Sequence, residues 1–217
     1  MSIHNLFEKI SELVNTSGKN DKQTILEKYK GDEDFRFTLN FLLNPFVLTR
    51  ISTKKINKEI EPFNIEMSGH NFDYITHLMA YLRGQSTGTD YNVYVAQSFI
   101  NKQETEELKK FVTQLVTKDL KLGVSEKTVN KVYGKGTIPE FAVMLAESYE
   151  KKGDKVKGKF YITLKLDGNR CVVVKEDGVV KFFSRKGQPI EGMSQLAEEF
   201  KELPDNTVYD GELLLVN

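Results

Sequence analysis

The hydrophobic pattern of the chain changes near residue 150, and this change limits the fold more than any other feature of the sequence. Before it, apolar residues recur at helical spacing in segments that end at glycine, proline or polar turns. After it, the apolar runs are short and rich in valine and phenylalanine, which is typical of strands. A lysine-rich stretch, residues 150–159, joins the two parts. We therefore expect an all-α region followed by an α+β region built on an antiparallel sheet.

The first part predicts a series of helices. Segment 91–100 fits a helix or a strand, and its position among helices favours a helix. We expect Asn20 or Asp21 to cap the second helix, Ser125 to cap the last one, and Gly123 to end the helix before it. The other predicted helices are segments 1–15, 22–30, 32–44, 71–84, 102–123 and 126–134.

The second part predicts short strands with a tight turn. The segment Glu176–Gly178 joins two of them and is typical of a hairpin. A short helix over 193–203 precedes the last strand and ends at Pro204. The predicted strands are segments 160–166, 171–175, 179–183 and 207–216.

Composition says more about the cellular environment of the chain than about its binding partners. Its 217 residues carry a formal net charge of zero, so only local charge clusters could attract a nucleic acid. No run of about 18 apolar residues is present, so we expect no membrane span. The single cysteine cannot form an internal disulfide, which favours a reduced, cytoplasmic setting. We expect Cys171 to be a buried apolar side chain rather than a reactive thiol.

The most specific pattern is K-x-D-G-x-R between two predicted strands; it consists of Lys165, Asp167, Gly168 and Arg170. Two further patterns follow, SRKG at 184–187 and DGE at 210–212. A lysine is a nucleophile only when its amine is neutral, and a semi-buried strand end beside a cation would lower its pKa. For a lone lysine, the commoner explanation is a snorkelling side chain on an edge strand.

Together the three patterns resemble nucleotidyl motifs I, Ia and III of the covalent nucleotidyltransferases, in the family's order. This superfamily contains ATP-dependent DNA ligases, RNA ligases and mRNA capping enzymes. Segments 109–133 and 138–153 resemble the end of the helical DNA-binding domain and the lead-in to the catalytic lysine in DNA ligases of the T-even bacteriophage type. The resemblance implies three parts: a helical DNA-binding domain over 1–133, a linker and lead-in over 134–158, and a truncated, ATP-grasp-like adenylation domain over 159–217.

The resemblance implies nick sealing through a lysyl-AMP, with ATP and Mg²⁺ as cofactors and nicked double-stranded DNA as the partner. Lys165 would carry the AMP. Asp167 would act in catalysis, and its alternative role is an ion pair with Arg170. The residues implied in binding the nucleotide are Thr163, Lys165, Gly168, Arg170 and Glu212.

The resemblance also implies contacts to the nick and to a metal. Ser184 and Arg185 match the pair that holds the 5′-phosphate, and hydroxyl and guanidinium groups are natural phosphate ligands. Glu212 would also assist the metal. Asp210 and Gly211 would shape a turn.

A group of lysines near the end of the helical part predicts a DNA-binding surface. The turn before residue 125 would present the amide groups of a helix N-terminus, where phosphates bind readily. Such contacts recognise charge and shape rather than base sequence. Taken alone, these lysines fit a solvated helix face, and the ligase patterns favour DNA. They are Lys118, Lys121, Lys127 and Lys131.

Two departures from the family leave alternatives open. Many DNA ligases carry Glu or Gln two positions before the lysine, where this chain has Thr163. Adenine recognition would then depend on backbone groups or other residues. The sequence also lacks motifs IV to VI and the OB-fold, so we expect a second chain or a missing C-terminal half to supply them. The alternatives are a non-catalytic DNA-binding module, or an RNA ligase or capping-type enzyme, which usually lacks a long helical leader.

Overall fold

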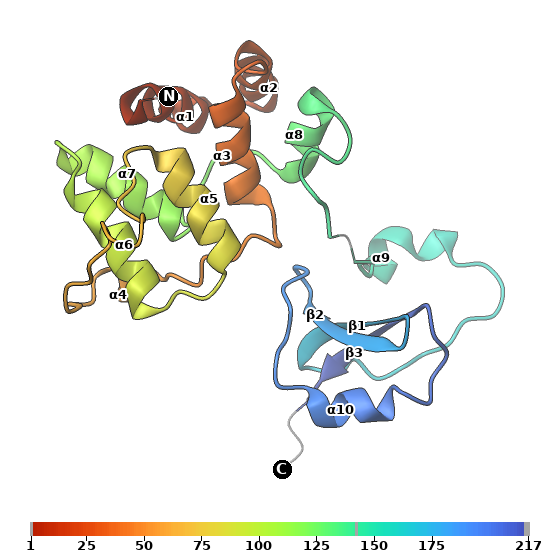
Figure 1. Cartoon of the computed structure of the whole chain (residues 1–217). Coiled ribbons are helices and arrows are strands. Elements are labelled where there is room, and N and C mark those ends of the chain that lie inside the picture. The colour runs from red at the N-terminus through yellow and green to blue at the C-terminus, as the bar shows by residue number, and fades with distance from the viewer. Residues whose placement is uncertain (1, 142, 215–217) are drawn as a thin grey trace. The chain divides into compact units, whose positions relative to one another are not determined.

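The computed structural model describes residues 2–141 and 143–214, and it divides the chain into two compact units (Figure 1). The first unit spans residues 1–140 and the second spans 141–217. The boundary between them falls inside the predicted lead-in over 134–158. Each unit has a hydrophobic core of its own.

The regular structure described in the first unit is helical, as the hydrophobic pattern predicts. Segment 91–100 lies within a helix, which resolves the ambiguity of that sequence. No helix in the described parts of the chain is long and apolar enough to cross a membrane. The helices are α1 Ile3–Asn15, α2 Lys19–Lys28, α3 Glu33–Leu43, α4 Thr53–Ile56, α5 Ile75–Gln85, α6 Asp90–Asn101, α7 Glu106–Val116 and α8 Glu126–Tyr133.

Side-chain caps set the start of several helices. Ser125 accepts a hydrogen bond from the Thr128 amide and begins α8, as predicted. The start of α2 differs from the prediction. Gly18 takes the cap position without a side-chain hydrogen bond, so the expected caps, Asn20 and Asp21, lie inside the first turn.

The predicted end of α7 at Gly123 is wrong. The helix ends at Val116, and Lys118 then takes a left-handed conformation with φ of 57°. Gly123 instead leaves room for Lys22, because a Cβ at Gly123 would lie 2.8 Å from the Lys22 Nζ. Lys22 is only 8% exposed and donates to the Leu13 and Leu122 carbonyls. A buried lysine therefore joins α1 and α2 to the loop before α8.

The second unit is a three-stranded antiparallel sheet with one helix on it (Figure 1). Its strand order is β2-β1-β3. The hairpin turn is confirmed, since Asp177 and Gly178 have φ of 50° and 73°, as a type I′ turn requires. α9 and the 3₁₀ turn fall in the lysine-rich stretch and were not predicted. The elements are α9 Tyr149–Lys152, a 3₁₀ turn Gly153–Lys155, β1 Asn169–Glu176, β2 Val179–Ser184, α10 Ser194–Glu199 and β3 Thr207–Leu213.

α10 covers one face of this sheet. Alternate residues of β1 point to that face, where Cys171 and Val173 form a small core with Phe182 of β2. Leu196 and Phe200 pack against this core. Cys171 is 3% exposed and burial raises the pKa of its thiol, so the prediction of a buried apolar side chain is confirmed.

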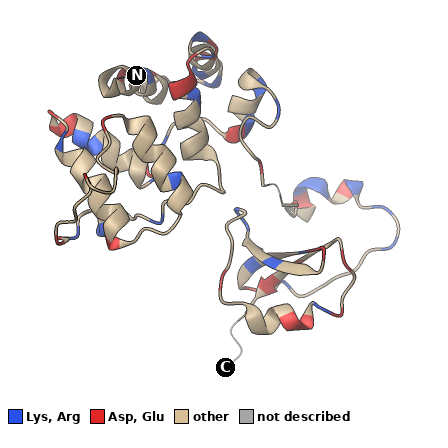
Figure 2. Cartoon of the chain, viewed as in Figure 1, with Lys and Arg blue, Asp and Glu red and all other residues tan. Residues whose placement is uncertain are grey.

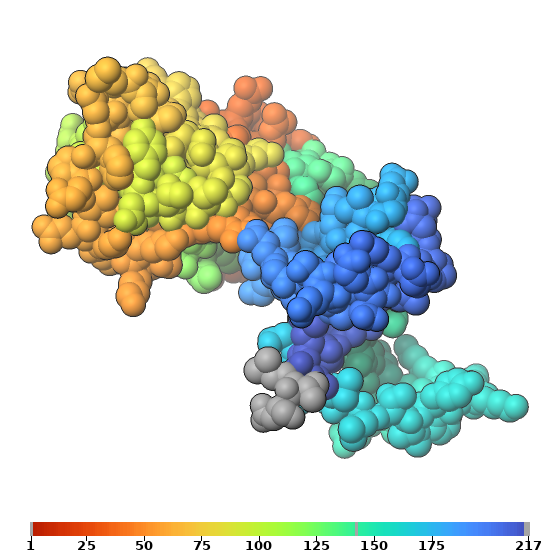
Figure 3. Space-filling view, turned by 60° about the horizontal axis from the view of Figure 1, so that its bottom comes forward, coloured from red at the N-terminus to blue at the C-terminus, as the bar shows by residue number. Residues whose placement is uncertain are grey.

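The predicted strand over 160–166 is wrong. These residues form no strand and pair with no described strand, although the run is almost continuously apolar. Tyr161 is 97% exposed, Ile162 89% and Leu164 84%. The cyan part of the chain, which includes this run, projects from the blue sheet of the same unit (Figure 3). A continuous apolar run is typical of a strand covered on both faces, and nothing described in this chain covers it.

The hairpin turn gives a matched test of backbone conformation. Gly178 and Gly211 belong to the same sheet, and a Cβ at either would meet nothing within 4 Å, but only Gly178 has a positive φ. We expect Gly178→Ala to lower the free energy of unfolding of the second unit by about 1 kcal/mol, because alanine is strained there. Gly211→Ala should leave it unchanged or raise it. Urea unfolding followed by the reactivity of Cys171 measures both, and equal effects would contradict the explanation.

Candidate functional site

The register of the sheet places the three sequence patterns side by side. Cys171 of β1 lies opposite Ser184 of β2 and opposite Gly211 of β3. Since neighbouring strands are about 4.8 Å apart, Ser184 and Gly211 lie roughly 10 Å apart across Cys171. The ends of the K-x-D-G-x-R, SRKG and DGE patterns therefore meet at one end of the sheet. Sequence spacing could not show this, because it depends on the pairing register.

Arg170 is held by a carboxylate that the sequence analysis assigned to a turn. Its Nε donates to Asp210 Oδ1 at 2.9 Å, and one Nη donates to the other carboxylate oxygen, while the same Nη donates to the Met144 carbonyl at 2.7 Å. The hydrogen bonds with Arg170 lower the pKa of Asp210, and those with Asp210 raise the pKa of Arg170. The pair stays ionised at neutral pH.

The turn role expected for Asp210 is therefore wrong, and the alternative role of Asp167, an ion pair with Arg170, is not observed. Asp210 lies inside β3 and does not shape a turn. The carboxylate that pairs with Arg170 is Asp210 rather than Asp167. The spacing of Asp210 and Glu212 could have indicated this, since residues two apart on a strand share one face of the sheet.

Glu212 lies directly opposite Arg170 in the β1–β3 pairing and is exposed. The sheet thus brings together two of the residues predicted to contact the nucleotide. No three His, Cys, Asp or Glu side chains in the described parts of the chain are grouped closely enough to hold a metal ion. Mg²⁺ commonly binds through one or two carboxylates together with water and substrate phosphates. A single exposed carboxylate fits that mode of binding, so Glu212 could assist a phosphate-bound Mg²⁺.

Lys165 and Asp167 precede β1 in the exposed run and lie outside the sheet. The expectation of a semi-buried strand end around Lys165 is wrong for the described residues, and Thr163 is exposed as well. Gly168 follows them where the chain approaches β3, since a Cβ there would lie 2.4 Å from the Leu213 carbonyl oxygen. Close approach to β3 is therefore a structural reason for glycine at this position.

Ser184 and Arg185 stand at a tight turn after β2. The Gly187 amide donates to the Ser184 carbonyl at 2.8 Å, and the Ser184 hydroxyl accepts from the Gln188 amide at 3.2 Å. Arg185 and Lys186 occupy the exposed tip. The turn therefore presents a guanidinium to solvent while the serine helps to close it.

Comparison with known proteins connects this sheet to one family. Residues 139–217 match the family described as ATP dependent DNA ligase domain. The DNA ligases of Enterobacteria phages T4 and T6 are each 28% identical to the chain over 228 residues, covering 94% of the chain and 44% of their own length. The chain is therefore similar to ATP-dependent DNA ligases, in its second unit to their ligase domain.

Solved structures agree with this ligase relationship over nearly the whole chain. The structure named Pmar-Lig_PreS3 has a TM-score of 0.62 at 26% identity, and that named Pmar-Lig_Pre has a TM-score of 0.63 at 27% identity. Each match covers 98% of this chain and 50% of the other. The chain thus spans about half or less of the length of the ligases it matches.

The lysines predicted to bind DNA, as in a ligase, divide into two kinds. Lys121, Lys127 and Lys131 are exposed on α8 and the loop before it, where blue segments mark basic residues (Figure 2). Lys118 is half-buried instead, and its ammonium donates to the Asn44 and Val47 carbonyls at 2.9 and 2.6 Å. Desolvation lowers the pKa of Lys118 to about 8. We therefore leave Lys118 out of the proposed DNA surface.

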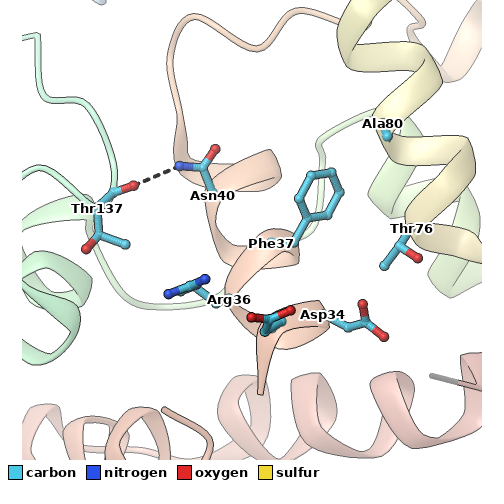
Figure 4. Close-up of a pocket in the computed structure, with 8 residues that line it drawn as sticks. Asp34, Arg36, Phe37, Asn40, Thr76, Ala80 and Thr137 are labelled. Atoms are coloured by element: carbon cyan, nitrogen blue, oxygen red, sulfur yellow. Dashed lines mark hydrogen bonds between the residues drawn. The ribbon is translucent and has the colours of Figure 1, made fainter. Parts of the chain in front are cut away.

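The helical unit also contains a cavity of about 590 Å³ between α3, α5 and the segment that follows α8 (Figure 4). The ring of Phe37 points toward Thr76 and Ala80 of α5, and the Asn40 side chain donates to the Thr137 carbonyl at 2.9 Å. Glu33 and Asp34 give this cavity more acidic than basic lining. It contains none of the predicted ligase residues and has no phosphate-binding character.

The position of Lys118 predicts a pH dependence of stability. The amine has a pKa of about 8 in the folded state and 10.5 ordinarily, so between these values the unfolded chain binds more protons. Stability contributed by this group therefore rises as the pH increases through that range. We expect the free energy of unfolding of the wild type, relative to Lys118→Met, to rise between pH 8 and pH 10. A difference that stays constant with pH would contradict this assignment.

Proposed function

We propose that the chain forms part of an ATP-dependent DNA ligase and supplies its DNA-binding unit and the lysine that carries AMP. The observation that supports this most strongly is the sheet register, which brings Arg170 of the first pattern to the same end of the sheet as the SRKG and DGE patterns, within the residues that match the ligase domain. Sealing nicks in duplex DNA would serve replication, repair and recombination in an intracellular setting.

In the first step, the neutral amine of Lys165 would attack the α-phosphorus of ATP. A nitrogen–phosphorus bond forms, the bond to the leaving pyrophosphate breaks, and the amine loses a proton. Arg170 suits a contact with the nucleotide because its guanidinium is always charged and Asp210 fixes its orientation. Mg²⁺, assisted by Glu212, would offset the charge of the triphosphate. Asp167 would act at the final joining step.

The surroundings of Lys165 must come from more than the described residues. The chain covers 44% of the length of the phage ligases, and the run 160–166 exposes its apolar side chains. We propose that the part of a ligase which this chain does not span, in the same or a second polypeptide, covers this run. That covering would bury Lys165 and favour its neutral form.

DNA would bind to two groups of residues. Lys121, Lys127 and Lys131 would contact backbone phosphates, and Ser184 with Arg185 would hold the nick 5′-phosphate. The first turns of α2 and α8 line one cleft of about 420 Å³, which supports phosphate binding near Ser125 because helix N-termini attract anions.

A second candidate function is a DNA-binding module without catalysis. The exposure of Lys165 in an unpaired run favours this alternative for the chain by itself. The two functions differ in whether Lys165 ever becomes covalently labelled.

Labelling with α-³²P-ATP and Mg²⁺ tests the proposed nucleophile. We expect retained label on a denaturing gel when the wild-type chain is combined with a polypeptide matching the rest of a ligase. Lys165→Ala and Lys165→Arg should both abolish the label, because neither supplies a neutral amine, and both should keep DNA affinity within about twofold.

Two outcomes would contradict this proposal. Label retained on Lys165→Arg would mean that charge rather than nucleophilicity is the role of the residue. No label in any combination, with nicked-duplex binding intact, would support the non-catalytic module.

The salt dependence of DNA binding tests the lysine surface. Each of the replacements Lys121→Ala, Lys127→Ala and Lys131→Ala should make the negative slope of log K against log salt shallower by about 0.9, because one phosphate contact is lost. Lys118→Met is the matched control, and it should leave the slope unchanged since that ammonium binds carbonyls. An equal loss in the control would contradict the division of these lysines.

A further inference from the structure

We propose that Phe141 is a positioning residue for the turn Ser184–Gly187, and thereby for recognition of a nick 5′-phosphate by Arg185. This inference rests on the proposed function of Arg185. Phe141 lies in the predicted lead-in to the catalytic lysine, far from this turn in the chain, and nothing in the sequence indicated this contact.

The turn is fixed at its base and open at its tip. Ser184 and Gln188 form two hydrogen bonds. The Ser184 amide donates to the Gln188 carbonyl at 2.8 Å, and the Gln188 amide donates to the Ser184 hydroxyl at 3.2 Å. Phe183 forms a bridge to Pro189 just beyond. Arg185 and Lys186 are exposed, whereas Gly187 is buried. Something must therefore cover Gly187 while leaving its neighbours in solvent.

Phe141 supplies that cover. A Cβ on Gly187 would lie 2.5 Å from Phe141 Cγ and 2.7 Å from its Cβ, so the phenylalanine rests directly on the glycine backbone. Gly187 also has φ of 78°, a conformation that residues with a Cβ rarely adopt. The Phe141 ring contacts Phe183 as well, with centroids 5.9 Å apart and planes tilted by 40°. One side chain thus packs on both ends of the turn.

Packing on Phe183 and on Gly187 limits the conformations of the three residues between them. A guanidinium binds phosphate most strongly when its backbone is already in place, because less conformational freedom is lost on binding. Phe141 would therefore strengthen the contact of Arg185 with a phosphate without touching the DNA. Loss of the Phe141 ring should reduce the preference for a nick with a 5′-phosphate more than it reduces the affinity for nicked DNA in general.

The test compares two fluorescent nicked duplexes that differ only in a 5′-phosphate or a 5′-hydroxyl at the nick. The measured quantity is the ratio of their affinities for the full chain. We expect Arg185→Ala to lower this ratio about tenfold, as the loss of charge-assisted hydrogen bonds implies. Phe141→Leu and Gly187→Ala should each lower it at least about threefold, with affinity for the 5′-hydroxyl nick unchanged.

A matched control separates positioning from general stability. Phe200→Leu removes an aromatic ring from the other face of the same sheet, where Phe200 contacts Phe182 and Tyr209. This variant should keep the wild-type ratio. Protection of Cys171 from thiol reagents reports whether the sheet is intact in every variant, because that side chain is buried.

The outcomes distinguish the inference from the function on which it rests. A reduced ratio in Arg185→Ala with a wild-type ratio in Phe141→Leu would overturn the role of Phe141 and leave that of Arg185. A wild-type ratio in Arg185→Ala would overturn the assignment of Arg185 and the inference with it. Equal reductions in Phe141→Leu and Phe200→Leu would assign the effect to stability and overturn the positioning role.

Discussion

Pairing of β1 with strands on both of its edges is the constraint on which the second unit depends. β1 is the central strand, and its register with β2 and β3 decides which side chains share a face and an end of the sheet. A slip by one residue would send Cys171 and Val173 to the opposite face and Arg170 into the core. The α10 core therefore fixes the register, and the register places Arg170 beside Glu212 on the opposite face. Packing on one face thus determines the chemistry available on the other.

Several lysines in this chain serve its structure. Lys22, Lys118 and Lys175 each turn inward and donate to two or three backbone carbonyls of other segments. In these contacts, backbone carbonyls accept the hydrogen bonds that water would accept from an exposed ammonium group. The remaining lysines of α8 and its preceding loop stay exposed, and they form the surface that we propose for DNA.

The exposed run 160–166 and the turn at Arg185 differ in how firmly contacts within the described residues hold them. The turn is already held by hydrogen bonds and by Phe141, so it can present its guanidinium without further partners. The lysine run has no such support within the described residues. The proposed function therefore needs additional chain at Lys165 but not at Arg185. This difference explains why phosphate recognition and lysine labelling can be tested separately.

The sequence by itself determined the order of helical and β regions, most helix positions, the hairpin turn and the three ligase patterns. These follow from local rules, namely hydrophobic period, capping and the φ preferences of glycine. Tertiary structure decided which charges turn inward, as for Lys118, and which carboxylate holds Arg170. It also decided that 160–166 pairs with no strand among the described residues and that Phe141 packs on Gly187. Those features depend on contacts between residues distant in the chain, which spacing along a sequence does not specify.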